Sequence, residues 1–122
     1  MDVSDAESVV MEVLWARSPR ASEEVIAELA QAQDWQEPTI RTLLNRLLNK
    51  GAITAEREGR RYLYSPVLQR QAWVDAQSRG LLDRVFKGRV APLVAHFSEQ
   101  GKLSRKDIAE LRRIIQELDN EH

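Results

Sequence analysis

The sequence predicts a mainly α-helical protein with one small β-hairpin. Three observations support this fold class. Apolar residues recur every three or four positions over most of the chain, a stretch near residue 55 alternates instead, and glycine or proline separates the two patterns. With 122 residues, the chain is long enough for one small domain or for a compact domain with an appended helical segment. The 43% apolar and 30% charged content is that of an ordinary globular protein.

The first two helices are predicted on both sides of Ser18-Pro19. Ser4 and Glu7 match the S-x-x-E capping box, and apolar residues at helical spacing follow until the chain reaches Ser18-Pro19. Ser22 is expected to cap the second helix, because its hydroxyl can accept a hydrogen bond from a backbone N–H of the first turn. This second helix should end near Gln33.

A third helix is predicted over residues 37–51, EPTIRTLLNRLLNKG, with Pro38 in its first turn and Gly51 as a left-handed C-cap. After Gly51 the period changes. AITAER alternates, a tight turn is expected at Glu58-Gly59, and RRYLYS follows until Pro66. Three helices followed by a two-stranded hairpin is the order of a winged helix-turn-helix. Since a lone hairpin is marginally stable in water, its apolar side should pack on the helices.

From Val67 onward the pattern is helical again, with interruptions at Gly88 and Pro92. A last helix should begin at Ser104, with Asp107 three residues on. We take Pro66 as the boundary between the two parts of the chain. Residues 1–66 are then a winged-helix DNA-binding domain, and residues 67–122 a helical dimerisation domain.

The net charge of -1 hides an uneven distribution of charge. Residues 1–37 carry a charge of -7, residues 38–66 carry +4 and residues 67–122 carry +2. The basic block therefore coincides with the third helix and the hairpin, which is where a polyanion would be attracted.

The third helix separates an apolar face from a polar face without acid. On a helical wheel, Ile40, Leu43, Leu44, Leu47 and Leu48 share one arc. Any amphipathic helix has a polar face, but its charges are usually mixed, whereas no Asp or Glu occurs from Pro38 through Ala55. Arg, Asn and Thr are the residue types that read guanine, adenine and thymine methyl groups. We therefore predict DNA contacts from Thr39, Arg41, Thr42, Asn45, Arg46, Asn49 and Lys50, with Thr42, Asn45 and Arg46 on base edges and Arg41 and Lys50 on phosphates.

The hairpin tip is the second predicted contact. Arg57, Arg60 and Arg61 flank the expected turn and suit phosphates or an adjacent minor groove. Two alternatives stay open: charges at hairpin tips often do no more than stay hydrated, and either Arg60 or Arg61 could brace the hairpin against the third helix.

Other classes of function find little support. The chain has no cysteine, neither histidine has a metal-ligand neighbour, and no acid–base pair or phosphate loop is visible, so we expect no metal, no cofactor and no enzyme activity. No apolar run is long enough to cross a bilayer and no leader peptide is visible, so a cytoplasmic protein without membrane insertion is expected. Trp15, Trp35 and Trp73 are interpreted as packing residues.

Several segments together resemble a known family. SEEVIAEL, TIRTLLNRLLNKGAI and EGRRYLYSP are similar to the winged-helix half of the penicillinase repressors (BlaI/MecI/CopY). LLDRVFKGRVAPLVAHFSEQGKLSRKDIAELRRII resembles the dimerisation half of the same family. The resemblance thus covers nearly the whole chain, and the pairing of both halves is more specific than a winged helix alone.

The resemblance implies a homodimeric transcriptional repressor that binds a palindromic operator in double-stranded DNA. The genes controlled in this family encode beta-lactamases, cell-wall transpeptidases or copper exporters. In the antibiotic-responsive members a membrane sensor protease cuts an Asn-Phe bond, which aligns with His96-Phe97, and this chain has His in place of Asn. The copper-responsive branch carries a cysteine-rich motif that this chain lacks.

A dimer also follows from the residues themselves. One small winged helix makes few base contacts, whereas two copies related by a two-fold axis can bind half-sites about one helical turn apart and add their binding energies. The apolar stripe of the last helix also needs a partner. The expected interface residues are Leu81, Leu82, Val85, Phe86, Leu93, Phe97, Ile108, Leu111, Ile115 and Leu118. The alternative is that about half of them form an intramolecular core.

Two other functions remain as alternatives to a repressor. A winged helix can serve as a protein-interaction adaptor, whose basic face docks an acidic partner without sequence-specific DNA binding. A regulator of similar layout could enclose a small molecule among its C-terminal helices, but no convergent polar cluster occurs there, so no small-molecule ligand is predicted.

Overall fold

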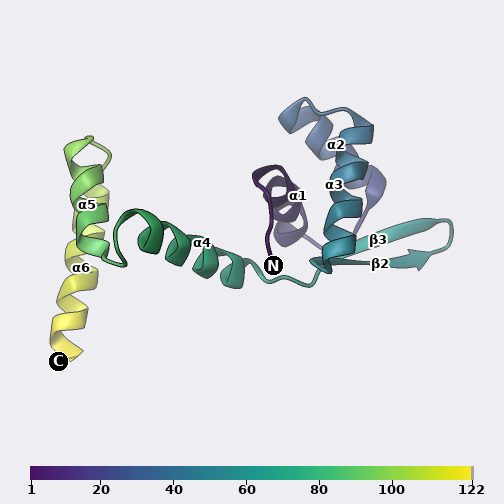
Figure 1. Cartoon of the computed structure of the whole chain (residues 1–122). Coiled ribbons are helices and arrows are strands. Elements are labelled where there is room, and N and C mark those ends of the chain that lie inside the picture. Colours follow the sequence, from purple (N-terminus) through teal and green to yellow (C-terminus); the bar gives the residue numbers. More distant parts are fainter. Residues whose placement is uncertain (122) are drawn as a thin grey trace. The chain divides into compact units, whose positions relative to one another are not determined.

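The computed structural model describes residues 1–121; residue 122, the last of the expected dimerisation domain, lies outside the described residues. The predicted fold class is confirmed: the chain is mainly helical with a small antiparallel sheet (Figure 1). It divides into two compact units, residues 1–75 and the residues from Ala76 onward. The elements in chain order are α1 (Asp5–Ala16), β1 (Arg20–Ala21), α2 (Ser22–Gln33), α3 (Glu37–Lys50), β2 (Ile53–Glu58), β3 (Arg61–Pro66), α4 (Arg70–Val85), α5 (Val90–Glu99) and α6 (Arg105–Glu121).

The sheet of the first unit has three strands in the order β1-β3-β2, so the prediction of a two-stranded hairpin was incomplete. The extra strand consists of Arg20 and Ala21, which pair with Tyr64 and Leu63 of β3. This short strand joins the connection between α1 and α2 to the middle of β3. The hairpin therefore rests on the helices through its backbone as well as through its side chains.

The hairpin turn lies one residue later than expected. Glu58 pairs with Arg61, so Gly59 and Arg60 form the two-residue loop in place of Glu58-Gly59. Gly59 has a φ of 64°, the left-handed conformation that a tight hairpin turn requires at its first loop position. Because this conformation is least strained for glycine, Gly59 fixes the turn and Arg60 becomes its outermost cation.

Both predicted features at the N-termini of the first two helices can be compared with the structure. The capping box of α1 is confirmed: Ser4 N donates to Glu7 Oε1 at 2.8 Å, and Glu7 N donates to Ser4 Oγ at 3.1 Å. The prediction that Ser22 caps α2 was wrong, because Ala21 is the N-cap and Ser22 is the first helical residue. Alanine has no side-chain acceptor, so only the return bond is made, from Ala21 N to Glu24 Oε1 at 3.3 Å.

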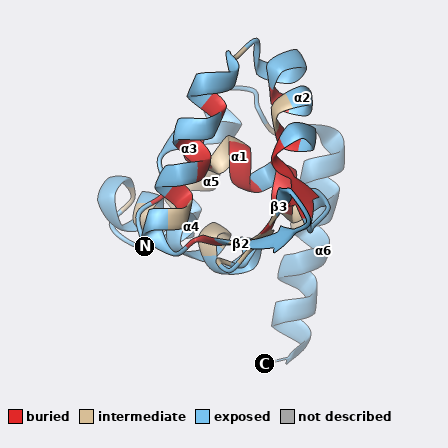
Figure 2. Ribbon diagram, turned by 90° about the vertical axis from the view of Figure 1, so that its right-hand side faces the viewer, coloured by how far each residue is buried: buried red, intermediate tan, exposed pale blue. Residues whose placement is uncertain are grey.

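The core of the first unit lies where α1, α2 and α3 meet the sheet. Its largest fully buried apolar side chains belong to Met11, Leu14, Ile40, Leu44 and Leu47, and Figure 2 shows buried residues gathered on α1, α3 and β3. All three tryptophans pack against this core, as predicted for packing residues.

Residues beyond β3 also belong to the first unit. Leu68 and Trp73 pack against the core, Trp15 Nε1 donates to Leu68 O at 2.8 Å, and the rings of Trp15 and Trp73 lie 5.4 Å apart. Arg70 at the start of α4 pairs with Glu12 of α1 at 2.8 Å. The expected domain boundary at Pro66 stays a prediction, and these contacts place the first residues of α4 with the helices before it.

The second unit contains the rest of α4 with α5 and α6. The start of α6 follows the prediction, because Ser104 and Asp107 exchange hydrogen bonds of 3.2 and 3.0 Å. No residue from Ala76 to Glu121 is buried. Within residues 1–121, no helix combines the length and apolar character that crossing a membrane requires.

Candidate nucleic-acid interface

The third helix has the two faces that its sequence predicts. Ile40, Leu43, Leu44 and Leu47 are buried in the core of the first unit. Gly51 follows as the C-cap, with a φ of 77°, so the helix ends where expected. The polar side chains are all exposed: Thr39, Arg41, Thr42, Asn45, Arg46, Asn49 and Lys50. The burial of one face thus fixes which side chains α3 offers to a partner.

The middle of the polar face is unoccupied by intramolecular bonds. Within the described residues, Asn45, Arg46 and Asn49 make no side-chain hydrogen bond or ion pair. Thr42 Oγ1 donates to Pro38 O at 2.9 Å, and Arg41 pairs with Glu37 at 3.3 Å. An exposed pair of this kind contributes only about 0 to 1 kcal/mol, so a phosphate can compete for Arg41.

Lys50 differs from the other cations of α3 because it reaches into the protein. Its Nζ lies 2.7 Å from Asp2 O and 2.5 Å from Glu7 Oε1. The side chain of Glu7 is only 1% exposed. Burial by itself would raise the pKa of Glu7, but the hydrogen bonds from Lys50 and Ser4 outweigh it and hold the pKa below its ordinary value. Lys50 therefore joins the end of α3 to the start of α1.

The hairpin adds basic residues beside α3. Arg57 Nε donates to Gly59 O at 3.0 Å, and Arg61 pairs with Glu58 at 3.2 Å. Arg60 lies in the turn and has no ion pair within the described residues. The predicted DNA contacts of Arg57, Arg60 and Arg61 stay predictions, but Arg60 has its charge free while Arg61 shares its charge with Glu58.

Tyr62 is a candidate that the sequence interpretation did not single out. It lies directly opposite Arg57 in the hairpin, so both side chains project from the same face, and it is 48% exposed. The phenol can donate a hydrogen bond to a phosphate oxygen. Tyr62 and the buried Tyr64 are two residues apart and share a face of β3, so alternation alone could not show that only Tyr64 is covered by the helices.

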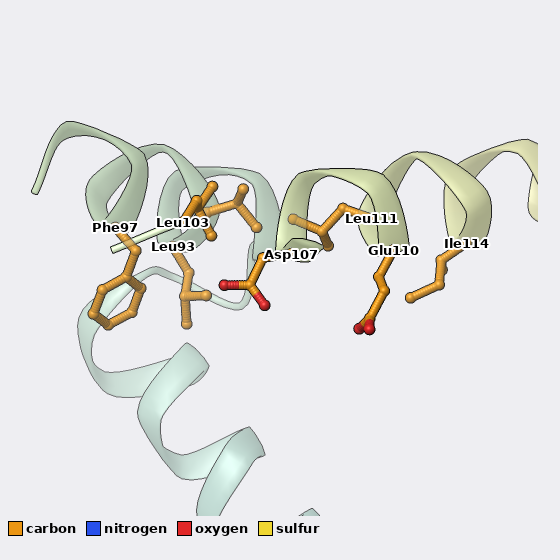
Figure 3. A pocket seen from close by; sticks show the side chains of 8 residues that line it. Leu93, Phe97, Leu103, Asp107, Glu110, Leu111 and Ile114 are labelled. Carbon is orange, nitrogen blue, oxygen red and sulfur yellow. The ribbon is translucent and has the colours of Figure 1, made fainter. Parts of the chain in front are cut away.

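The second unit offers an apolar surface. Leu93, Val94, Phe97, Leu103, Leu111 and Ile114 line a hollow between α5 and α6, with Asp107 and Glu110 at its edge (Figure 3). A neighbouring hollow continues it along α6 to Ile115 and Leu118. Among the expected interface residues, Val85, Ile115 and Leu118 are at least 50% exposed. None of the ten residues expected at a dimer interface is buried inside the described chain.

The two residues of the expected cleavage site lie inside α5. Both His96 and Phe97 are exposed, and their rings lie 5.4 Å apart. The ring of Phe86 lies 6.4 Å from that of His96. Among residues 1–121, no cluster of three His, Cys, Asp or Glu side chains has the arrangement of a metal site.

Comparison with known sequences gives one consistent result. A family model described as penicillinase repressor matches residues 3–117. A penicillinase repressor of Bacillus licheniformis is 37% identical over 118 residues, which cover 97% of this chain and 92% of that protein. The methicillin resistance regulatory protein MecI of Mammaliicoccus sciuri is 32% identical over 114 residues, 93% of each chain.

Solved structures resemble the first unit. The solution structure of the DNA-binding domain of the repressor BlaI matches with a TM-score of 0.54 and 42% identity, covering 57% of this chain and 84% of that one. The monomeric form of Bacillus licheniformis BlaI in complex with the blaP half-operator matches with a TM-score of 0.53 and 41% identity, covering 58% and 87%.

Proposed function

The chain belongs to the penicillinase repressor family, and on that basis we propose that it is a transcriptional repressor that binds a palindromic operator as a homodimer. One observation carries the proposal. The exposed face of α3, which carries no acid after Glu37, lies beside a basic hairpin, in the unit that resembles a relative solved with its half-operator. DNA binding places the site of action in the cytoplasm.

The middle of α3 supplies the base contacts. Arg46 can donate two hydrogen bonds to guanine, Asn45 can pair with adenine, and Thr42 offers a hydroxyl and a methyl group. Asn45 and Arg46 need break no intramolecular bond before they reach a base. A side chain that has no internal partner can contact DNA without the free-energy cost of first breaking an internal hydrogen bond or ion pair.

The phosphate contacts come from the edges of the same surface. Arg60 at the hairpin turn and Arg57 on β2 carry positive charge beyond α3, and Tyr62 can add a neutral hydrogen bond. Arg41, Thr39 and Asn49 border the base-reading residues on α3. Such contacts position the helix and give affinity that depends on salt but little on sequence.

The DNA proposal is tested by fluorescence anisotropy with two labelled duplexes. One duplex carries a palindromic candidate operator, and the other has the same composition in scrambled order. We expect the palindrome to bind at least 10³-fold more tightly, in the range typical of specific recognition. Equal affinity for both duplexes would favour the alternative of a protein-interaction adaptor.

The homodimer is proposed from the second unit. Its apolar side chains stay exposed along α4, α5 and α6, as for Val85 and Ile115, which are 58% and 56% exposed. Burying one such side chain contributes about 1.5 to 3 kcal/mol, and a run of them is the usual sign of a protein interface. A second copy presents the same apolar residues, so a two-fold interface can cover both surfaces at once. The proposed interface consists of Leu81, Leu82, Val85, Phe86, Leu93, Phe97, Ile108, Leu111, Ile115 and Leu118.

The dimer is tested by sedimentation equilibrium of two neighbouring variants of α6. Ile115→Glu places a carboxylate on the apolar stripe and should yield monomers at concentrations where the native chain is dimeric. Gln116→Glu adds the same charge about 100° around the helix, off the apolar stripe, and should leave the dimer intact. A native chain that sediments as a monomer at high concentration would contradict the proposal.

The names of the relatives suggest which genes are controlled. Because the relatives are a penicillinase repressor and a methicillin resistance regulatory protein, we propose that this repressor controls beta-lactamase or cell-wall genes. From the family resemblance of the second unit we propose also that a membrane sensor protease relieves repression. A cut at His96-Phe97 would divide the hollow between α5 and α6, because Leu93 lies before the bond and Leu111 after it. Loss of the dimer would then release the operator. Mass spectrometry of the protein from antibiotic-treated cells tests this, since a fragment ending at His96 is expected.

A further inference from the structure

Glu7 and Lys50 form the most buried ion pair near the proposed DNA surface, and the proposed function does not use Glu7. The carboxylate of Glu7 is 1% exposed and lies in the first turn of α1. Its Oε1 accepts from Ser4 N and from Lys50 Nζ, while its Oε2 is buried without a hydrogen bond within the protein.

We propose that Glu7 is a positioning residue that binds the ammonium of Lys50, holds the end of α3 on α1, and keeps Lys50 from neutralising a DNA phosphate. This inference rests on the proposed DNA-binding function and reassigns Lys50 from a phosphate contact to a structural cation.

The buried carboxylate of Glu7 needs a cation. An unpaired buried carboxylate is destabilising, and removing one partner of a buried ion pair costs far more free energy than breaking an exposed ion pair. Lys50 is the only cation with an ion pair to Glu7 within the described residues. Moving its Nζ to a phosphate would leave Glu7 charged and unpaired, so the protein competes strongly with DNA for this cation.

Lys50 and Arg46 occupy neighbouring positions on one side of α3. Lys50 lies four residues after Arg46, so the two side chains start from the same side of the helix, one turn apart. Arg46 has no ion pair within the described residues, whereas Lys50 has two oxygen partners. Although the two basic residues lie one helical turn apart, Lys50 is held by the protein and only Arg46 is free to bind DNA.

The test is the salt dependence of binding to a labelled 30-base-pair duplex of random sequence. Each phosphate that a cation neutralises adds about 0.9 to the slope of log affinity against log salt concentration. For Lys50→Met the slope should equal that of the native protein, while Arg60→Ala, which removes a proposed phosphate contact at the hairpin turn, should lower it by about 0.9. Circular dichroism checks that each variant is folded at the temperature used.

Glu7→Gln provides the second arm and does not depend on the folding of Lys50→Met. Glutamine keeps an acceptor for Ser4 N, as in a Ser-x-x-Gln capping box, but removes the negative charge that holds Lys50, whose remaining partner is the neutral Asp2 O. The slope should steepen by about 0.9, and adding Lys50→Met to Glu7→Gln should return it to the native value. Asp5→Asn is the matched control, because it removes the same charge from the first turn of α1 without releasing a cation, and its slope should stay native.

Two results would overturn the inference. One is a slope that falls by about 0.9 for Lys50→Met in the otherwise native chain, which would make Lys50 a phosphate contact. The other is a slope for Glu7→Gln that does not change. If the native protein bound no duplex at all, the proposed function would fail first, so the two failures can be distinguished.

Discussion

Two arginines of the first unit are expected to differ in what they contribute to DNA binding. Arg46 lies on the base-reading part of α3, and Arg60 lies in the hairpin turn. We predict that Arg46→Ala lowers operator affinity by about 1 to 3 kcal/mol and reduces discrimination against scrambled DNA. Arg60→Ala should weaken binding to both duplexes equally and lower the salt slope by about 1. Arg61→Ala should act in the same way but less, because Arg61 already shares its charge with Glu58.

The control for these three variants is Arg105→Ala in the first turn of α6, which removes the same charge from the second unit. Anisotropy titrations with the palindromic and scrambled duplexes measure the four variants and the native chain. Binding curves that superimpose for Arg46→Ala, Arg60→Ala and the native chain would show that the wrong surface has been assigned.

The Glu7 carboxylate should also make the stability of the fold depend on pH. Burial raises the pKa of Glu7, but the hydrogen bonds from Lys50 and Ser4 lower it by more than burial raises it. The pKa in the folded state therefore lies below the value in the unfolded chain. A carboxylate of this kind stabilises the fold fully above its unfolded pKa, about 4.3, and its contribution is lost as the pH falls through the folded-state pKa. The melting temperature of the native chain should therefore exceed that of Glu7→Gln at pH 6, and the difference should shrink toward pH 3. A difference that stays constant over this range would contradict the pKa assignment.

At the scale of the elements, α3 depends on its C-cap for its end and for the path of the chain into β2. Gly51 has a φ of 77°, and an added Cβ would meet no atom within 4 Å, so only backbone strain opposes a side chain there. Gly51→Ala should lower the free energy of unfolding by about 1 kcal/mol. Gly80→Ala is the opposite case, because Gly80 lies inside α4 without a positive φ and should gain helix stability. Urea unfolding followed by circular dichroism measures both, and equal signs for the two variants would refute this account.

Local patterns predicted the elements, and non-local contacts account for what was missed. Ser4 with Glu7 and Gly51 define helix ends through bonds to near neighbours, so the sequence alone was sufficient for them. β1 was not predicted, because two residues carry no period and Ala21 pairs with Leu63, far along the chain. Ala21 is both the last residue of β1 and the N-cap of α2, so the helix begins at Ser22, one residue earlier than a Ser22 cap implies.

In the candidate site, too, local features were predicted and contacts between distant residues were missed. The helical wheel correctly separated the exposed face of α3 from its buried face, since periodicity alone determines this. It could not show that Lys50 reaches Glu7, which lies 43 residues away. Whether a basic side chain is free depends on such distant partners, so a count of cations in the sequence overestimates those available to DNA.

At the scale of the whole molecule, the chain combines a unit with a closed core and a unit without one. The first unit buries side chains such as Leu14 and Leu44, whereas no residue from Ala76 to Glu121 is buried. A segment of this kind gains its stability when its apolar residues are covered by another chain. Folding of the second unit and dimerisation should therefore occur together.

Two fragments test this division of the chain. Residues 1–75 retain Leu68 and Trp73, which pack on the core, and should fold as a monomer that binds a single half-site. Residues 1–66 lack both side chains and the bond from Trp15 to Leu68, and should be less stable by on the order of 2 kcal/mol. The full chain should bind a palindrome about 10² to 10⁴ times more tightly than the 1–75 fragment. Once one DNA-binding unit of the dimer has bound, the other is held close to the second half-site of the palindrome. Sedimentation, thermal melting and anisotropy measure the three quantities, and a dimeric 1–75 fragment would place the interface in the first unit.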